Sequence, residues 1–141
     1  MLLCTTCNDS RNRKKIENSV GKPYTLDERE KLQGVHSPVM EIVSSSLPLR
    51  NLLILNPGDN NCTLELRPRG IILYFSSVMG RHAFVIPYYK LSIRKINAGT
   101  YGIHKDNYRI GINVINREGR DFIKKILRSR TDSLPFFADD L

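Results

Sequence analysis

The sequence lacks residues and segments on which several classes of protein depend. It has no Trp, three Cys and only 8% aromatic residues among 141, so any core is expected to be mainly aliphatic. No apolar run approaches the roughly 18 residues of a membrane-spanning helix. The start, Met1–Cys4, is too short for the apolar region of a secretory signal. The expected compartment is therefore the cytoplasm, with no transmembrane segment.

Patterns of catalysis and metal binding are missing as well. The chain contains no H-E-x-x-H, no G-x-S-x-G and no G-x-x-x-x-G-K-[ST]. Cys4 and Cys7 have C-x-x-C spacing, but Cys62 stands alone, so no second pair completes the four ligands of a structural zinc site. His82, at the start of an expected strand, is interpreted as a structural histidine. We expect no metal, no cofactor and no enzymatic activity.

Positive charge is concentrated in one part of the chain. Residues 1–66 carry eight basic and eight acidic groups, whereas residues 67–130 carry fourteen basic and three acidic groups. Residues 131–141 carry three Asp and no base. The net charge of the whole chain is +8, and it belongs to residues 67–130. Such a region attracts polyanions, for example nucleic acid or an acidic membrane surface, although a basic protein can also be merely soluble.

Alternation of apolar and polar residues predicts about seven short strands. The clearest run is Tyr108–Val114, in which four apolar residues alternate with Arg, Gly and Asn. Ile71–Phe75 is continuously apolar, which predicts burial on both faces. Val39–Val43 is interpreted as an edge strand and Asn51–Leu55 as an apolar strand. The other expected strands are Thr63–Arg67, His82–Ile86, Leu91–Arg94 and Thr100–His104.

A helix is expected after the last strand. Phe122, Ile123, Ile126 and Leu127 form one apolar stripe at helical spacing, with basic residues opposite, so Arg117–Arg130 is expected to be helical. A competing interpretation makes Asn116–Gly119 a hairpin turn and continues a strand through Phe122.

The N-terminal part shows less order. Met1–Pro23 has no hydrophobic period and is expected to be flexible. Thr25 and Glu28 fit a capping box, which predicts a short helix over Leu26–Gln33 that ends before Gly34.

Strands followed by one helix, without helices between them, favour an antiparallel sheet. This order resembles the pleckstrin-homology-like superfamily over about residues 50–130. The resemblance implies a bent, partly open barrel of seven antiparallel strands closed by a C-terminal helix, with Phe122 in place of the Trp of eukaryotic members. The loop Asn56–Asn61 lacks the basic residues of lipid-binding members. The matching stretches are Pro68–Ile71, Val85–Leu91 and Arg117–Phe122.

The expected fold is thus mainly β, of the α+β class. Residues 1–35 are expected to form a flexible extension with a short helix, residues 36–130 the barrel and its helix, and residues 131–141 an acidic and apolar tail. Phe136 and Phe137 in this tail would be costly to expose. We therefore expect the tail to pack on its own barrel or on a neighbouring copy, which allows oligomerisation; a disordered end is the alternative.

Basic and aromatic residues are interleaved along the strands. Such a surface can bind nucleic acid by stacking and phosphate contacts, although Tyr is also common in strands for packing. The leading interpretation is a non-catalytic interaction module that recognises a protein segment or an anionic surface, for example by strand addition along Val39–Val43. The alternative is a sequence-tolerant nucleic-acid-binding protein. The candidate ligand-binding residues are Arg67, Arg69, Lys90, Arg94, Lys95, Arg109, Tyr88 and Tyr108.

Overall fold

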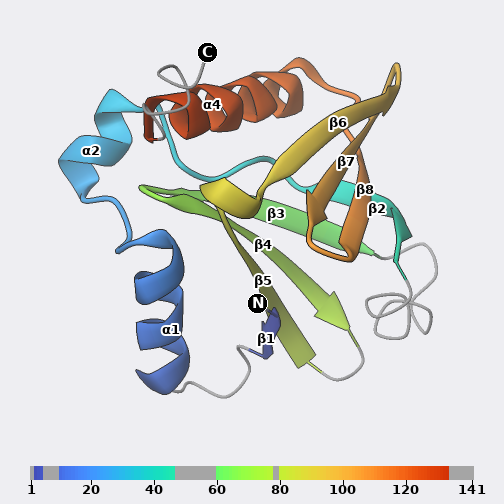
Figure 1. Cartoon of the computed structure of the whole chain (residues 1–141). Helices are drawn as coiled ribbons and strands as arrows, with labels where there is room; N and C mark the ends of the chain where they lie inside the picture. Colours follow the sequence, from blue (N-terminus) through green and yellow to red (C-terminus); the bar gives the residue numbers. More distant parts are fainter. Residues whose placement is uncertain (1, 5–9, 47–59, 78–79, 134–141) are drawn as a thin grey trace, which may run out of the picture.

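The structure is a computed structural model that describes residues 2–4, 10–46, 60–77 and 80–133 (Figure 1). Its helical elements are α1 (Ser10–Val20), α2 (Leu26–Lys31), the 3₁₀ helix η1 (Tyr88–Lys90) and α4 (Arg117–Ser133). Its strands are β1 (Leu2–Cys4), β2 (Met40–Ser45), β3 (Asn61–Arg67), β4 (Gly70–Ser77), β5 (Gly80–Pro87), β6 (Ser92–Asn97), β7 (Thr100–Lys105) and β8 (Tyr108–Asn113).

The described strands form a single antiparallel sheet in the order β1-β5-β4-β3-β2-β8-β7-β6. The sheet ends at β1 and β6, and hydrogen bonds do not close it. The predicted arrangement of seven antiparallel strands with a C-terminal helix is confirmed by β2–β8 and α4. Strand β1 is an eighth strand that the sequence did not reveal. The predicted strand Asn51–Leu55 lies outside the described residues, as does the tail 134–141.

Strand β2 joins the two halves of the sheet. Met40 pairs with Cys62 of β3, while Ile42 pairs with Ile112 of β8. The register shifts between Ile42 and Ser44, and an irregularity of this kind bends a strand. The prediction that Val39–Val43 forms a sheet edge is therefore wrong. Alternation shows which side chains are buried, but it does not show whether a neighbouring strand occupies each side of the backbone.

The main core lies between the inner face of the bent sheet and α4. Phe122, Ile123 and Ile126 are buried there, whereas Leu127 is 39% exposed at the margin of the stripe. The helix begins where the amide of Gly119 donates to Asn116 Oδ1 over 2.7 Å. The predicted helix is confirmed, and the competing strand through this region is wrong. Within the described residues, no helix has both the length and the apolar character that crossing a bilayer requires.

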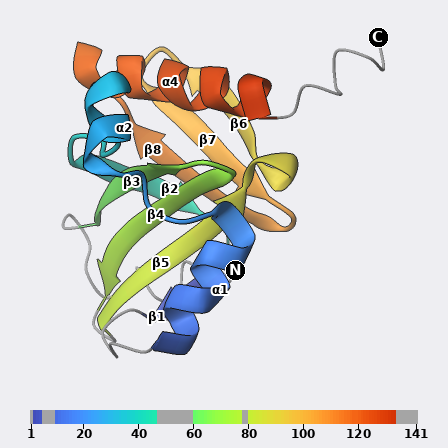
Figure 2. The same cartoon turned by 90° about the vertical axis from the view of Figure 1, so that its left-hand side faces the viewer.

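A second apolar layer lies on the outer face of β4 and β5, where α1 packs (Figure 2). Val20 of α1 is buried against Ile72 of β4, and Ile16 packs on the same cluster. Because the neighbouring residues of β4 face the main core, the predicted burial of Ile71–Phe75 on both faces is confirmed at its centre. The prediction of a flexible chain over residues 1–23 is wrong for Ser10–Val20. Only two of the eleven residues of α1 are apolar, Ile16 and Val20, and both pack on the sheet. Two apolar residues are too few to show a helical period in the sequence.

The predicted capping box of α2 is present. The amide of Thr25 donates to Glu28 Oε1 over 3.0 Å, and the amide of Glu28 donates to Thr25 Oγ1 over 3.3 Å. The helix ends before Gly34, whose φ of 96° suits glycine. The ammonium of Lys125 on α4 donates to the Gly34 carbonyl over 3.0 Å, which connects this end of α2 to the C-terminal helix. The proposed domain boundaries at residues 35 and 130 stay predictions.

The contact between α1 and the sheet can be tested at Gly70. A Cβ at this position would overlap the Ile86 carbonyl and Val20 Cγ1, so Gly70→Ala should lower the free energy of unfolding by about 1–3 kcal/mol through overpacking. The matched control is Gly99→Ala, because a Cβ there meets only Asn113 Oδ1 at 3.4 Å. Urea unfolding of both variants measures the difference. Equal effects would contradict the close approach of α1 to β4.

Candidate functional site

Two of the predicted ligand-binding residues are buried parts of the framework. The side chain of Arg67 donates from Nε to the Glu65 carboxylate and from Nη1 to the Gly21 carbonyl over 2.9 Å. Tyr88 is 1% exposed, and its hydroxyl donates to the Arg67 carbonyl over 3.0 Å. Neither side chain can meet a ligand at the surface without leaving these partners.

The buried ion pair of Glu65 and Arg67 is the centre of a polar network that reaches the surface at His36. The hydroxyl of Tyr74 donates to Glu65 Oε1 over 2.9 Å, and His36 Nε2 lies 3.5 Å from the same oxygen. Burial, and then the charge of Glu65, raises the pKa of Tyr74, so its phenol stays protonated and donates. Through Gly21 this network also holds the chain that follows α1. Its role is to attach the N-terminal helices to the sheet.

Three further predicted residues have partners within the molecule. Arg69 Nη2 donates to the Glu17 carbonyl over 3.0 Å, near the end of α1. Lys90 Nζ lies 3.6 Å from Asp106 Oδ2. The ring of Tyr108 packs edge-on against Phe84, with centroids 5.4 Å apart, on the main core. Tyr88 and Tyr108, the tyrosines in the candidate set, therefore pack inward.

The remaining predicted arginines, Arg94 and Arg109, lie together on the outer face of β6–β8. Arg109 is directly opposite His104, and Arg94 is directly opposite Gly102, two residues from His104 on the same strand. Residues paired in this way share a face of the sheet. Both arginines are exposed, and neither forms an ion pair with another described residue. We call Arg94, His104 and Arg109 the basic sheet face.

Two glycines leave the centre of the basic sheet face without side chains above the backbone. Gly102 and Gly111 pair with each other across β7 and β8. A Cβ at Gly111 would overlap Ser44 Oγ, and a Cβ at Gly102 would lie 3.0 Å from His104 Nε2. Because the glycines have no side chains, the side chain of Ser44 can lie over Gly111 and the ring of His104 over Gly102. Ile96 beside them is 54% exposed, so the surface combines positive charge with an accessible apolar group.

The electrostatics of the basic sheet face favour an anion. Burial, and then the charges of Arg94 and Arg109, lower the pKa of His104. Lys95 adds charge to β6, but it pairs with Tyr101 and so faces the other side of the sheet. Among the described residues, Glu41 of β2 also lies on this face, but it pairs with Asn113, four residues from Arg109 along β8. The sequence placed Arg94 and Arg109 in the candidate set but gave no sign of His104, because its proximity to both depends on strand pairing.

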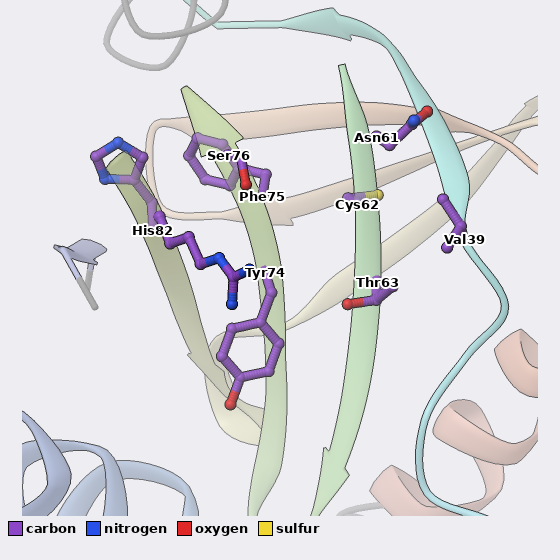
Figure 3. A pocket seen from close by; sticks show the side chains of 9 residues that line it. Val39, Asn61, Cys62, Thr63, Tyr74, Phe75, Ser76 and His82 are labelled. Atoms are coloured by element: carbon purple, nitrogen blue, oxygen red, sulfur yellow. The ribbon is translucent and has the colours of Figure 1, made fainter. Parts of the chain in front are cut away.

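A cavity of about 420 Å³ opens at the other half of the sheet (Figure 3). We call it the outer pocket. Thr63 and Tyr74 face each other across β3 and β4, and Ser76 faces Arg81 across β4 and β5. Thr63, Ser76 and Arg81 were not among the predicted ligand-binding residues, because their convergence depends on strand pairing. The cavity is lined by Val39, Asn61, Cys62, Thr63, Tyr74, Phe75, Ser76, Arg81 and His82.

The pocket contains neither a reactive thiolate nor a charged histidine at neutral pH. Burial raises the pKa of Cys62 to about 12, so this residue remains a thiol. Burial also lowers the pKa of His82, whose ring stacks on Phe75 with centroids 5.1 Å apart. This environment agrees with the interpretation of His82 as a structural histidine. Among the described residues, no three His, Cys, Asp or Glu side chains lie close enough to hold a metal ion.

The different roles of the arginines can be tested by stability. Arg67→Met should lower the free energy of unfolding by about 3–5 kcal/mol, because it leaves the buried Glu65 carboxylate without its partner. Arg94→Met removes the same charge from the surface and should change stability by less than about 0.5 kcal/mol. Urea unfolding at neutral pH compares the two. A similar cost for both variants would show that Arg67 is not structural.

The burial of His104, together with the charges of Arg94 and Arg109, predicts a dependence of stability on pH. Its pKa in the folded protein is lowered from the usual value of about 6.5, so the unfolded chain binds its proton more readily. Stability should therefore be complete above about pH 6.5 and fall as the pH drops below that value. His104→Gln should reduce the loss between pH 7.5 and pH 5.5, measured by urea unfolding. The loss should not vanish, because the pKa of His82 is lowered as well. An unchanged loss in this variant would contradict the geometry.

Comparison of this chain with protein-family models, with curated proteins and with solved structures finds no match in any of the three.

Proposed function

We propose that this protein is a non-catalytic interaction module that binds an acidic segment of a partner protein at the basic sheet face. The observation that carries this proposal is the pair of exposed guanidinium groups of Arg94 and Arg109, which have no ion pair with another described residue and flank His104. Like charges held together on a flat surface repel each other, and an anionic partner relieves that repulsion.

Strand β6 supports an extended segment as the partner. Among the described strands, β6 pairs only with β7 and so forms one end of the sheet. The free side of an edge strand can pair with an added strand, whose backbone then supplies affinity. Strand β6 has no acidic residue and carries Arg94 and Lys95 on successive positions. Arg94 pairs with Gly102 on the outer face, whereas Lys95 pairs with Tyr101 and faces the other side of the sheet. Acidic side chains on one face of the added strand would therefore meet Arg94.

The placement of the tyrosines favours a protein partner over nucleic acid. Sequence-tolerant binding of single strands relies on exposed aromatic rings for stacking. Tyr88 is buried, and Tyr101 and Tyr108 are packed against the main core. Tyr89 is 68% exposed, but it belongs to η1 and the ammonium of Lys90 lies over its ring, 5.9 Å from the centroid. The basic sheet face therefore offers charge without a stacking platform.

We also propose a relationship to the pleckstrin-homology-like superfamily. The support is the order of β2–β8 in the sheet, in which four consecutive strands and then three consecutive strands meet at β2 and β8, with α4 against the inner face. The free and buried thiol of Cys62 suits a reducing compartment, so a cytoplasmic location is part of the proposal.

The proposal can be tested with a labelled peptide in which Asp or Glu alternates with Val, titrated with the full chain by fluorescence anisotropy. Arg94→Gln should weaken binding about tenfold, since one hydrogen bond to a charged group contributes about 1.5 kcal/mol and about 1.4 kcal/mol is tenfold in affinity. Arg109→Gln should weaken it less, because β7 and β6 lie between Arg109 and the added strand. Arg128→Gln is the matched control. It removes the same charge from the exposed side of α4, and affinity should be unchanged.

Two results would overturn the proposal. Equal weakening by all three substitutions would mean that binding follows net charge alone. Tighter binding of a single-stranded oligonucleotide than of the peptide, lost in the Arg94 and Arg109 variants, would assign the face to nucleic acid.

A further inference from the structure

We infer that the outer pocket is a second binding site, which takes a small organic phosphate and is separate from the basic sheet face. The pocket lies over β3, β4 and β5, whereas the basic sheet face lies over β6, β7 and β8. The inference does not depend on the proposed function, because it rests on different residues in the other half of the sheet.

Donors from three adjacent strands converge on this pocket. Thr63 is directly opposite Tyr74, and Ser76 is directly opposite Arg81. Thr63, Ser76 and Arg81 lie at alternate or paired positions, so they share the outer face of the sheet. Figure 3 shows Thr63 and Ser76 on neighbouring strands, with Asn61 at the start of β3, and Arg81 lines the same cavity. Two hydroxyl groups, one amide and one guanidinium match the several acceptor oxygens of a phosphate group.

The charge of the lining selects an anion. No Asp or Glu is among the lining residues. The Cys62 thiol is protonated and His82 is uncharged at neutral pH, for the reasons given above. Glu65, the acidic residue next along the outer face of β3, is already paired with Arg67. Among the lining residues, Arg81 carries the formal charge, and this residue also has a contact within the chain.

The size and the apolar wall indicate an organic ester instead of the free ion. A volume of about 420 Å³ lies within the range of about 300–1,000 Å³ typical of small-molecule sites, and an inorganic phosphate would fill only part of it. Val39, 64% exposed, and the ring of Tyr74 form an apolar side of the pocket. A ligand with its phosphate near Ser76 and Arg81 and a compact planar group near Val39 and Tyr74 satisfies both parts.

The test is a titration of the full chain with phenyl phosphate, followed by isothermal calorimetry and by amide chemical shifts. Inorganic phosphate and phenol are titrated separately, and each should bind at least about tenfold more weakly than phenyl phosphate, because each uses only one part of the site. Shifts should concentrate on β3–β5. Absence of phenyl phosphate binding, or shifts that concentrate on β6–β8, would overturn the inference.

Substitutions then show which side chains donate hydrogen bonds to the phosphate group. Arg81→Gln should abolish binding of phenyl phosphate. Because Arg81 has further contacts in the structure and this variant can fail to fold, Thr63→Val and Ser76→Ala provide milder changes, each expected to weaken binding about three- to tenfold, the value of one neutral hydrogen bond. Unchanged affinity in both milder variants would overturn the inference.

Arg94→Gln is the matched control for this site. It should leave the affinity for phenyl phosphate unchanged, while the proposed function requires it to weaken binding of the acidic peptide. The two proposals can therefore fail independently. Loss of phenyl phosphate binding in Arg94→Gln would overturn the separate pocket, and an unchanged peptide affinity would overturn only the proposed function.

Discussion

Hydrogen bonding of β2 on both of its sides holds the structure together. Its two partners, β3 and β8, belong to groups of strands that are otherwise consecutive in the chain, so β2 makes them one sheet. The irregularity after Ile42 lets the sheet bend, and β6–β8 then lie across β3–β5 below α4 (Figure 1). One core supports both halves, and each half keeps its own outer face. This is why one small domain presents two distinct candidate surfaces, the outer pocket and the basic sheet face.

Some basic residues of this chain stabilise the fold, and others are exposed on its surface. Arg67, Arg69, Lys125 and Arg130 donate hydrogen bonds to backbone carbonyls, and these bonds attach α1, α2, η1 and α4 to their neighbours. Groups of this kind are held by internal partners and contribute little to recognition. Arg94 and Arg109 differ because their side chains have no such partner among the described residues. The net charge of residues 67–130 therefore overstates the charge that is available to a partner, because part of it is used within the fold.

Local features of the fold were predictable from the sequence, and features that depend on distant partners were not. The capping box at Thr25 and the apolar stripe of Phe122 and Ile126 are formed within a few residues, so spacing alone reveals them. The pairing of β2 on both sides and the packing of α1 on Ile72 depend on segments far apart in the chain. For the candidate site, alternation could not separate Arg67 from Arg94. One readable signal existed: Glu65 and Arg67 are two residues apart and so lie on one face, where they can pair.

The central claim is that the free side of β6 receives an acidic segment, and hydrogen exchange of the β6 amides tests it most directly. The chain would be compared with and without the acidic peptide, with amides resolved individually. Because strand addition forms new backbone hydrogen bonds along β6, the account predicts slower exchange within Ser92–Asn97 and little change in β1, the other end of the sheet. Unchanged exchange in β6 at saturating peptide, or slowing confined to β1 or α4, would contradict it.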